Sequence, residues 1–359
     1  MEPNSNQAAP RRALHRFAVA TALATLGLIA VGGLVTSHGA GMAVPDWPTT
    51  YGYNMFLFPI SLWKGGIFYE HSHRVYASAV GLLTVILAVW LWFAAPTRGL
   101  KWAGIIALGL VGVQGALGGM RVVLFKDQIG IVHATLAQLF LVWMSGIALG
   151  TSSWWMNFSR GKTVAAVPAA LVRAFGLVTL LVLVQLILGA SMRHQHAGLA
   201  VPDFPLAYGS VWPATDAESV LRYNQARVET TAYNQITGSQ VLLHMSHRVG
   251  AVVIYGAVAL CAWFAMRRLS VSHPVARISL AWFGIVNLQF LLGAATVWSV
   301  KAADVATAHV VTGALALLAG AGATAVAFRT RGNVLTLSAA NAREEQPAWA
   351  PKISAEVAR

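Results

Sequence analysis

Apolar residues in this chain gather into eight long runs that are separated by shorter polar segments. A helix needs about 20 apolar residues to cross the hydrocarbon core of a bilayer, and each run is close to that length. The pattern therefore predicts an all-α integral membrane protein with eight transmembrane helices. The predicted spans cover residues 17–36, 71–94, 102–120, 130–150, 171–191, 241–264, 277–297 and 304–328.

Composition supports a membrane protein and excludes several other classes. The 359 residues are 57% hydrophobic and 10% charged, whereas about 25% of residues are charged in soluble proteins. The net charge of +13 does not indicate nucleic-acid binding, because the basic residues lie mostly in short segments between the apolar runs. The single cysteine, Cys261, excludes a disulfide, a CxxC motif and a thiolate metal site within the chain.

The basic residues also predict how the chain is oriented in the membrane. Lys and Arg gather in cytoplasmic segments, so the alternation of spans can be tested against their positions. If the N-terminus is cytoplasmic, the inner segments hold 16 of the 25 basic residues, although the outer segments are longer. We therefore expect both termini in the cytoplasm, and a multi-pass protein of the plasma membrane. The first apolar run is too long for the core of a cleaved signal peptide.

The second half of the sequence repeats the first in three ordered places. The first pair of matched segments is identical at eight of twelve positions. Each half also carries a Ser-His-Arg-Val motif and a Gln-x-x-x-Gly motif. The matched segments are 41–52 with 198–209, 72–75 with 246–249, and 114–118 with 289–293. Ordered matches of this kind indicate an internal duplication.

Each repeat contains four spans, so both repeats start on the same side of the membrane. This predicts two parallel-repeat four-helix bundles related by a pseudo-twofold axis along the membrane normal. The expected organisation is a cytoplasmic N-terminal tail, two four-helix halves and a disordered cytoplasmic tail. The corresponding residues are 1–16, 17–165, 166–330 and 331–359.

Four histidines recur in the repeat, near the outer ends of four different predicted helices. They are His73 and His133 in the first half, and His247 and His309 in the second. A hydrogen-bonded core histidine is the alternative for any one of them, but ionisable residues within a membrane are costly and usually functional. Neutral imidazole is an axial ligand of heme iron, and zinc or copper would need further ligands. The pattern therefore favours one heme in each half.

Charged neighbours of these histidines differ between the halves. Arg74 and Arg248 follow a histidine directly, and they either pair with heme propionates or extend to the outer headgroups. Glu70 lies one helical turn before His73, and its counterpart in the second half is His244. A carboxylate there can act as an acid, a base or a charge stabiliser, or it can simply favour a helix N-terminus. We read His244 as structural.

Taken together, eight spans in two repeats, Glu70-x-x-His73-Arg74, His133, His247-Arg248 and His309 resemble the heme A synthase family. The Pro-Asp-Trp-Pro and Pro-Asp-Phe-Pro turns are similar to outer loops of that family, although its common loop cysteine pair is absent here. The resemblance covers roughly residues 17–328. It implies an oxidoreductase that converts the C8 methyl group of heme O to the formyl group of heme A, by two hydroxylations and loss of water.

The resemblance also implies a division of labour between the halves. The second half would hold a permanent heme b through His247 and His309, and the first half would bind heme O through His73 and His133. Glu70 would be the catalytic carboxylate. Implied partners are heme O, membrane lipid, an electron donor and the farnesyltransferase that makes heme O, and a homo-oligomer is left open.

Two other functions remain open from the residues alone. A di-heme b-type electron-transfer cytochrome would need both histidine pairs but no carboxylate beside one of them. A heme transporter or chaperone would use one pair transiently, and parallel repeats also occur in transporters. Glu70 favours the enzyme over the cytochrome.

Overall fold

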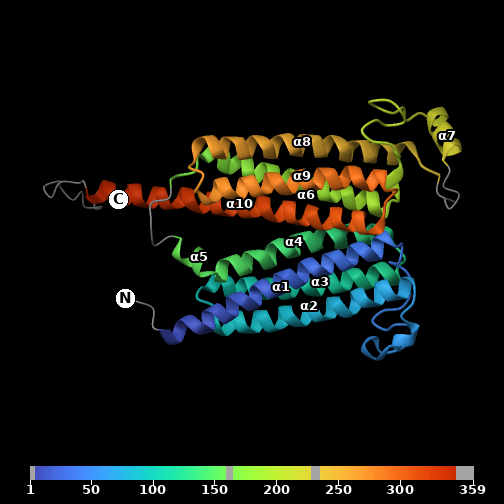
Figure 1. Ribbon diagram of the computed structural model, residues 1–359. Helices are drawn as coiled ribbons and strands as arrows, with labels where there is room; N and C mark the ends of the chain where they lie inside the picture. Colours follow the sequence, from blue (N-terminus) through green and yellow to red (C-terminus); the bar gives the residue numbers. More distant parts are fainter. Residues whose placement is uncertain (1–4, 159–164, 228–234, 345–359) are drawn as a thin grey trace, which may run out of the picture.

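The computed structural model describes residues 5–158, 165–227 and 235–344, which form helices joined by loops (Figure 1). Eight of the described helices are long and apolar enough to cross a membrane, which confirms the eight predicted spans. They are α1 (Ser5–Ser37), α2 (Gly66–Ala94), α3 (Arg98–Val123), α4 (Asp127–Thr151), α6 (Ala169–His194), α8 (Gly238–Arg268), α9 (Pro274–Trp298) and α10 (Ala303–Glu344). The shorter elements are η1 (Met55–Leu57), η2 (Ile60–Leu62), α5 (Ser153–Asn157), η3 (Ala197–Leu199) and α7 (Ala217–Ala226).

The helices begin a few residues before their apolar runs, and polar residues cap the first turns of some of them. The side chain of Thr97 accepts a hydrogen bond from the backbone of Leu100 at the start of α3. Thr237 and Gln240 form a reciprocal capping box at the start of α8. Such caps satisfy backbone N–H groups that have no partner within the helix. All four paired histidines lie more than one turn inside their helices, away from the helix ends.

The C-terminal segment differs from its prediction. Helix α10 continues to Glu344, whereas the sequence predicted a disordered tail from residue 331. Residues 331–344 are rich in Ala, Leu and Arg, which favour a helix even without an apolar face to bury. The remainder of that tail, 345–359, lies outside the described residues.

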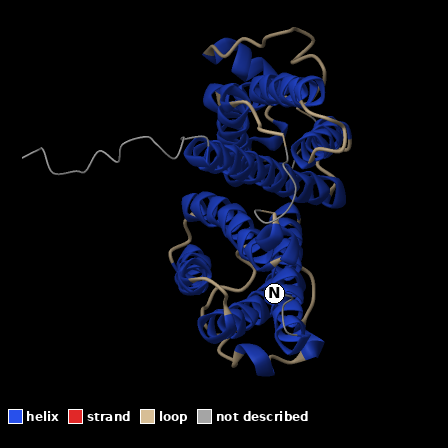
Figure 2. Cartoon of the chain, turned by 90° about the vertical axis from the view of Figure 1, so that its left-hand side faces the viewer, coloured by secondary structure: helices blue, strands red, loops and turns tan. Residues whose placement is uncertain are grey.

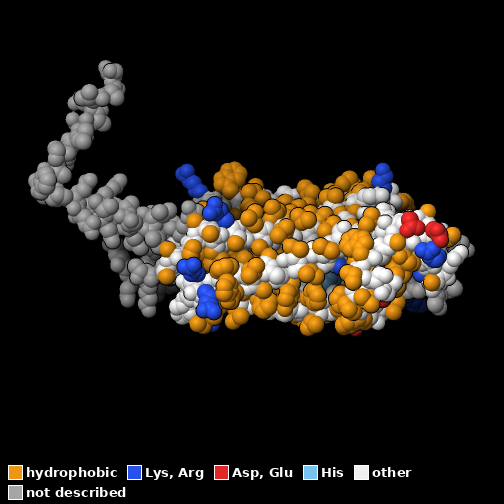
Figure 3. Space-filling view, turned by 90° about the horizontal axis from the view of Figure 1, so that it is seen from above, with side chains coloured by type: hydrophobic (Ala, Val, Ile, Leu, Met, Phe, Trp, Pro, Cys, Tyr) orange, Lys and Arg blue, Asp and Glu red, His pale blue; other side chains and the backbone are white. Residues whose placement is uncertain are grey.

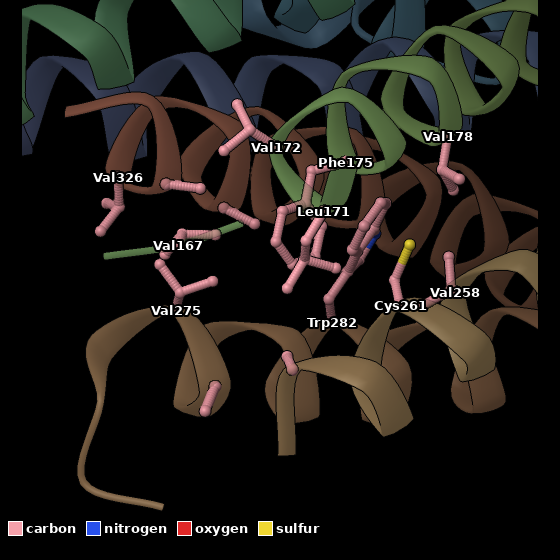
Figure 4. Packing of buried hydrophobic residues seen from close by; sticks show 14 of the residues in the cluster. Val167, Leu171, Val172, Phe175, Val178, Val258, Cys261, Val275, Trp282 and Val326 are labelled. Atoms are coloured by element: carbon pink, nitrogen blue, oxygen red, sulfur yellow. The ribbon is translucent and has the colours of Figure 1, made fainter. Parts of the chain in front are cut away.

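The long helices form two groups of four, which lie one above the other in the end-on view (Figure 2). In the first group α1 and α3 each pack on both α2 and α4, and in the second α6 and α9 each pack on both α8 and α10. Each group has its own apolar core, such as the cluster around Phe175, Trp282 and Cys261 (Figure 4). Cys261 is a buried free thiol, as expected for a small apolar residue.

Helices α1 and α10 join the two groups near the end of the molecule that carries the two long loops (Figure 1). Arg193 of α6 donates to the carbonyl of Gly33, at 2.9 Å, and to the hydroxyl of Ser37. The Ser37 hydroxyl also lies 3.3 Å from that of Thr307. A methyl group at Gly33 would lie only 3.0 Å from Thr307, so α1 and α10 are in close contact here. We call these four residues the junction.

The surface agrees with a membrane setting. Hydrophobic side chains cover the middle of the visible face, and most charged side chains lie toward its two ends (Figure 3). The first turns of α1 and the last turns of α10 lie at the same end of the molecule, as an even number of spans requires (Figure 1). The two long loops lie at the opposite end, which we call the outer end.

Candidate functional site

The second-half histidines face each other across the centre of their helix group. His247 of α8 and His309 of α10 have ring centroids 6.5 Å apart, with the ring planes at 71°. An imidazole nitrogen binds a metal at about 2 Å, with the ring centre about 1 Å farther, so two rings on one iron have centroids about 6 Å apart. Within the described chain, Nδ1 of both rings is buried without a hydrogen-bond partner. The pair therefore fits a metal centre held between two imidazoles.

The first-half histidines occupy the corresponding positions. His73 lies in α2 and His133 in α4, and these helices pack mainly on α1 and α3 between them. Nδ1 of His133 is also buried with no partner among the described residues. The structure thus brings the second-half pair together, and it places His73 and His133 on the equivalent helices of the first half.

Each of the four histidine rings lies against a glycine of a neighbouring helix. A methyl group on Gly32, Gly189 or Gly293 would be close enough to shift the ring, whereas on Gly118 it would make an ordinary contact. The distances are 3.1 Å from Gly32 to His73, 3.5 Å from Gly118 to His133, 3.2 Å from Gly189 to His247, and 3.1 Å from Gly293 to His309. Gly32, Gly189 and Gly293 therefore set the positions of the rings that they contact.

Three glutamines contact the backbone or the ring of three of these histidines. Gln114 donates to the backbone carbonyl of His133, and Gln185 donates to that of His247 at 2.7 Å. Nε2 of Gln289 lies 3.4 Å from Nε2 of His309. Sequence reasoning found the Gln-x-x-x-Gly match only as a sign of duplication. Its repetition in both halves was the available signal for Gln114 and Gln289, whereas Gln185 lies outside the matched segments.

Glu70 is buried, with 4% of its surface exposed. One carboxylate oxygen accepts a hydrogen bond from the backbone N–H of Val44, and the other pairs with Arg74, both at 2.8 Å. In the second half, Nδ1 of His244 lies 3.3 Å from the carbonyl of Ala197. The predicted asymmetry is therefore also a difference in how each outer loop is anchored, and only the first half places a carboxylate there.

Arg74 and Arg248 have a role that neither sequence-based alternative described. The terminal nitrogens of Arg74 donate to three carbonyl groups of the first outer loop, in addition to Glu70. Arg248 donates to three carbonyl groups of the second outer loop. Both guanidinium groups therefore anchor a loop above the histidines. The accepting residues are Val44, Asp46 and Thr49 in the first loop, and Val201, Asp203 and Leu206 in the second.

The two outer loops are folded alike around their aspartates. Asp46 accepts from the backbone N–H groups of Tyr51 and Gly52, and Asp203 accepts from those of Tyr208 and Gly209. Burial opposes ionisation of Asp46, but hydrogen bonds from Gly52, Thr49 and Tyr51 outweigh it and lower its pKa below 3.8. In the first loop the Trp47 ring lies directly against Gly119 of α3.

The other histidines near the outer end do not join these pairs. His71 is fully buried, and its Nδ1 lies 3.1 Å from the hydroxyl of Thr50, so it supports the first loop. His194 lies against Gly130 of α4. Among the described residues, no group of three or more His, Cys, Asp or Glu side chains is placed to hold a metal ion. The two sites are therefore built from pairs of histidines.

Comparison with known proteins decides the family. Residues 15–321 match the family COX15-CtaA, described as "Cytochrome oxidase assembly protein". The chain belongs to this family. The match covers all eight membrane-spanning helices except the first residues of α1 and the last part of α10.

Similar members of the COX15-CtaA family are named "Heme A synthase". The protein of Sphingopyxis alaskensis is 27% identical over 345 residues, covering 88% of this chain and 92% of the relative. That of Geobacillus kaustophilus is 27% identical, covering 83% and 86% of the two chains. That of Methylobacterium radiotolerans is 25% identical, covering 79% and 82%. The similarity extends over most of each chain, so both histidine pairs fall within the region shared with the family.

Proposed function

We propose that this protein is a heme A synthase, a membrane oxidoreductase that converts the C8 methyl group of heme O to a formyl group. Membership of the COX15-CtaA family and the names of its relatives support this activity. The observation that carries the proposal is the second-half pair, whose 6.5 Å ring separation fits one iron between two imidazoles. A hydrophobic helix group around such a pair suits the apolar ring of a heme.

The two halves are proposed to be parallel repeats, each a four-helix bundle, related by a pseudo-twofold axis. The matching loop contacts of Asp46 and Asp203 support this arrangement, as do the glycines against all four histidines. Residues 17–165 form the first bundle and residues 166–330 the second. Both termini lie in the cytoplasm and the protein resides in the plasma membrane, because the basic residues gather at the end opposite the two long loops.

The second half is proposed to hold the resident heme b, through His247 and His309. Iron with two imidazole ligands has no open position, so the bound heme would supply one-electron transfer. Gly189 and Gly293 fix where the two rings lie, and Gln185 holds the backbone at His247. These residues keep the ring separation constant.

The first half is proposed to bind heme O, through His73 and His133. Glu70 gives this half a carboxylate at a position where the other half has His244. It is held at the outer end of α2 by Arg74 and by the N–H of Val44. A buried carboxylate in this place can stabilise positive charge or accept a proton as the substrate methyl carbon is oxidised.

Expression in a membrane that makes heme O but not heme A tests the activity. We expect heme A, or its hydroxylated intermediate, to appear among the extracted and chromatographed hemes. Both hemes bound with neither product formed would instead indicate a di-heme electron-transfer cytochrome. Heme that is bound only at one site and released to an acceptor would indicate a transporter or chaperone.

The glycine contacts predict a second result. Gly293→Ala should lower the heme b content about five-fold or more, because overpacking against a fixed ring costs about 1 kcal/mol or more. The helix itself should be no less stable, since Ala favours a helix over Gly. Gly284→Ala in the same helix is the matched control, because nothing lies within 4 Å of its added methyl group. Equal heme b in both variants, measured by pyridine hemochrome, would contradict a positioning role.

A further inference from the structure

Arg121 is a second cation beside the first histidine pair. It lies in the last turn of α3, the helix that packs on both histidine-bearing helices of this half. It lies three residues after Gly118, whose backbone lies against the ring of His133, and its side chain is only 17% exposed. The guanidinium group therefore lies at the outer end of the same site as the two rings.

The guanidinium group of Arg121 is enclosed without being fully paired. The nearest carboxylate, that of Asp127, lies 3.4 Å away on a side chain that is 47% exposed. A methyl group at Gly41 would lie 2.7 Å from both terminal nitrogens, so the first outer loop closes directly over them. Within the part of the chain that is described, the buried Nε–H has no hydrogen-bond partner. A buried donor left unpaired is unfavourable, and an anionic ligand would satisfy it.

The neighbouring Arg74 and the aligned position of the second half are arranged differently. The terminal nitrogens of Arg74 already donate to three loop carbonyl groups and to Glu70. In the second half, the Gln-x-x-x-Gly alignment places Thr296 opposite Arg121, and the Thr296 hydroxyl donates to a carbonyl of its own helix. Only the first half therefore has an arginine at this aligned position, whereas in the second half the equivalent loop glycine, Gly198, lies against the side chain of Lys301.

We propose that Arg121 binds a propionate carboxylate of the substrate heme. This assignment rests on the proposed function, in which the first half takes heme O. Heme carries two propionate groups that are anionic at neutral pH, and its apolar ring must lie between the helices. Arginine presents donors in a planar fork that pairs with a carboxylate through two hydrogen bonds. The Nε–H and one terminal N–H of Arg121 form that pair, which orients the ring between His73 and His133.

Binding of heme O and of its dimethyl ester to the purified full-length protein tests this assignment. Esterification removes both negative charges and leaves the ring and iron unchanged. The unmodified protein should bind heme O about ten-fold or more tightly than the ester, in line with a charge-assisted hydrogen-bonded pair. Arg121→Gln should bind both ligands equally, at about the affinity of the unmodified protein for the ester. Difference absorption spectra report binding, and extraction with chromatography reports which hemes are bound.

Lys126→Gln is the matched control, because it removes an exposed positive charge from the same outer segment. It should keep the preference for heme O, and Arg121→Lys should keep only part of it. Heme b content should be the same in all variants, since the second half is untouched. Equal binding of acid and ester by the unmodified protein would overturn the assignment without any variant, as would an undiminished preference in Arg121→Gln. Heme A formation is measured separately, so loss of the proposed activity is not confused with loss of this contact.

Discussion

Glu70→Gln is expected to lower heme A and its hydroxylated intermediate by about 100-fold or more, which is the usual contribution of a positioned acid or base. The amide keeps the shape of the side chain and can still accept the hydrogen bond from Val44. It cannot carry negative charge or take a proton at neutral pH. Heme b should remain at its normal level, because the variant lies in the other half. Extraction and chromatography of hemes from a membrane that makes heme O provide both measurements.

The ion pair with Arg74 supplies the control for this experiment. Arg74→Gln breaks the same contact from the other side and also removes three bonds to the loop, yet it leaves the carboxylate in place. If Glu70 acts chemically, Glu70→Gln will reduce heme A more than Arg74→Gln does, while heme O still binds. An equal or smaller effect of Glu70→Gln would show that the carboxylate only anchors the outer loop.

His247→Ala is expected to remove nearly all of the resident heme b. The substitution deletes one of two rings whose 6.5 Å separation suits a single iron, and no other described histidine lies opposite His309 at that distance. Free imidazole should enter the resulting space and restore part of the absorption spectrum, because it replaces the missing ligand. The heme b content is measured by pyridine hemochrome in the purified protein.

His244→Ala is the matched control, since it removes a buried histidine from the same helix, one turn away. We expect it to keep heme b, because His244 contacts the carbonyl of Ala197 rather than the paired rings. Full heme b occupancy in His247→Ala would exclude His247 as a ligand. Loss of heme b in both variants to the same extent would indicate a general effect on the fold of this half.

The spans and the histidine pairs could be predicted because each depends on a simple property of the sequence. About 20 apolar residues are needed to cross a bilayer, so the number and length of the apolar runs determine the number of membrane-spanning helices. His73, His133, His247 and His309 could be found because the duplication aligned them. The helical part of the C-terminal segment was missed, since its Ala-rich composition favours a helix but supplies no apolar run.

The contacts of the arginines and glycines could not be predicted from sequence. Arg74 follows a histidine, which suggested a ligand contact, but the loop that folds over it supplies carbonyl groups from residues far away in the chain. Gly293 is one of 33 glycines, and nothing in the sequence says which of them faces an imidazole. These features depend on how helices approach one another, which local pattern does not encode.

The junction has a consequence for how the two centres work together. Gly32 touches the ring of His73, and the next residue, Gly33, contacts Thr307, which lies two residues before His309. Because glycine has no side chain, the backbone of α1 lies directly against the ring of His73 on one side and the short side chain of Thr307 on the other, so little between them can rotate or compress. Electron tunnelling weakens steeply with separation, so we expect this contact to act as a rigid spacer that holds the gap between the two irons constant during turnover.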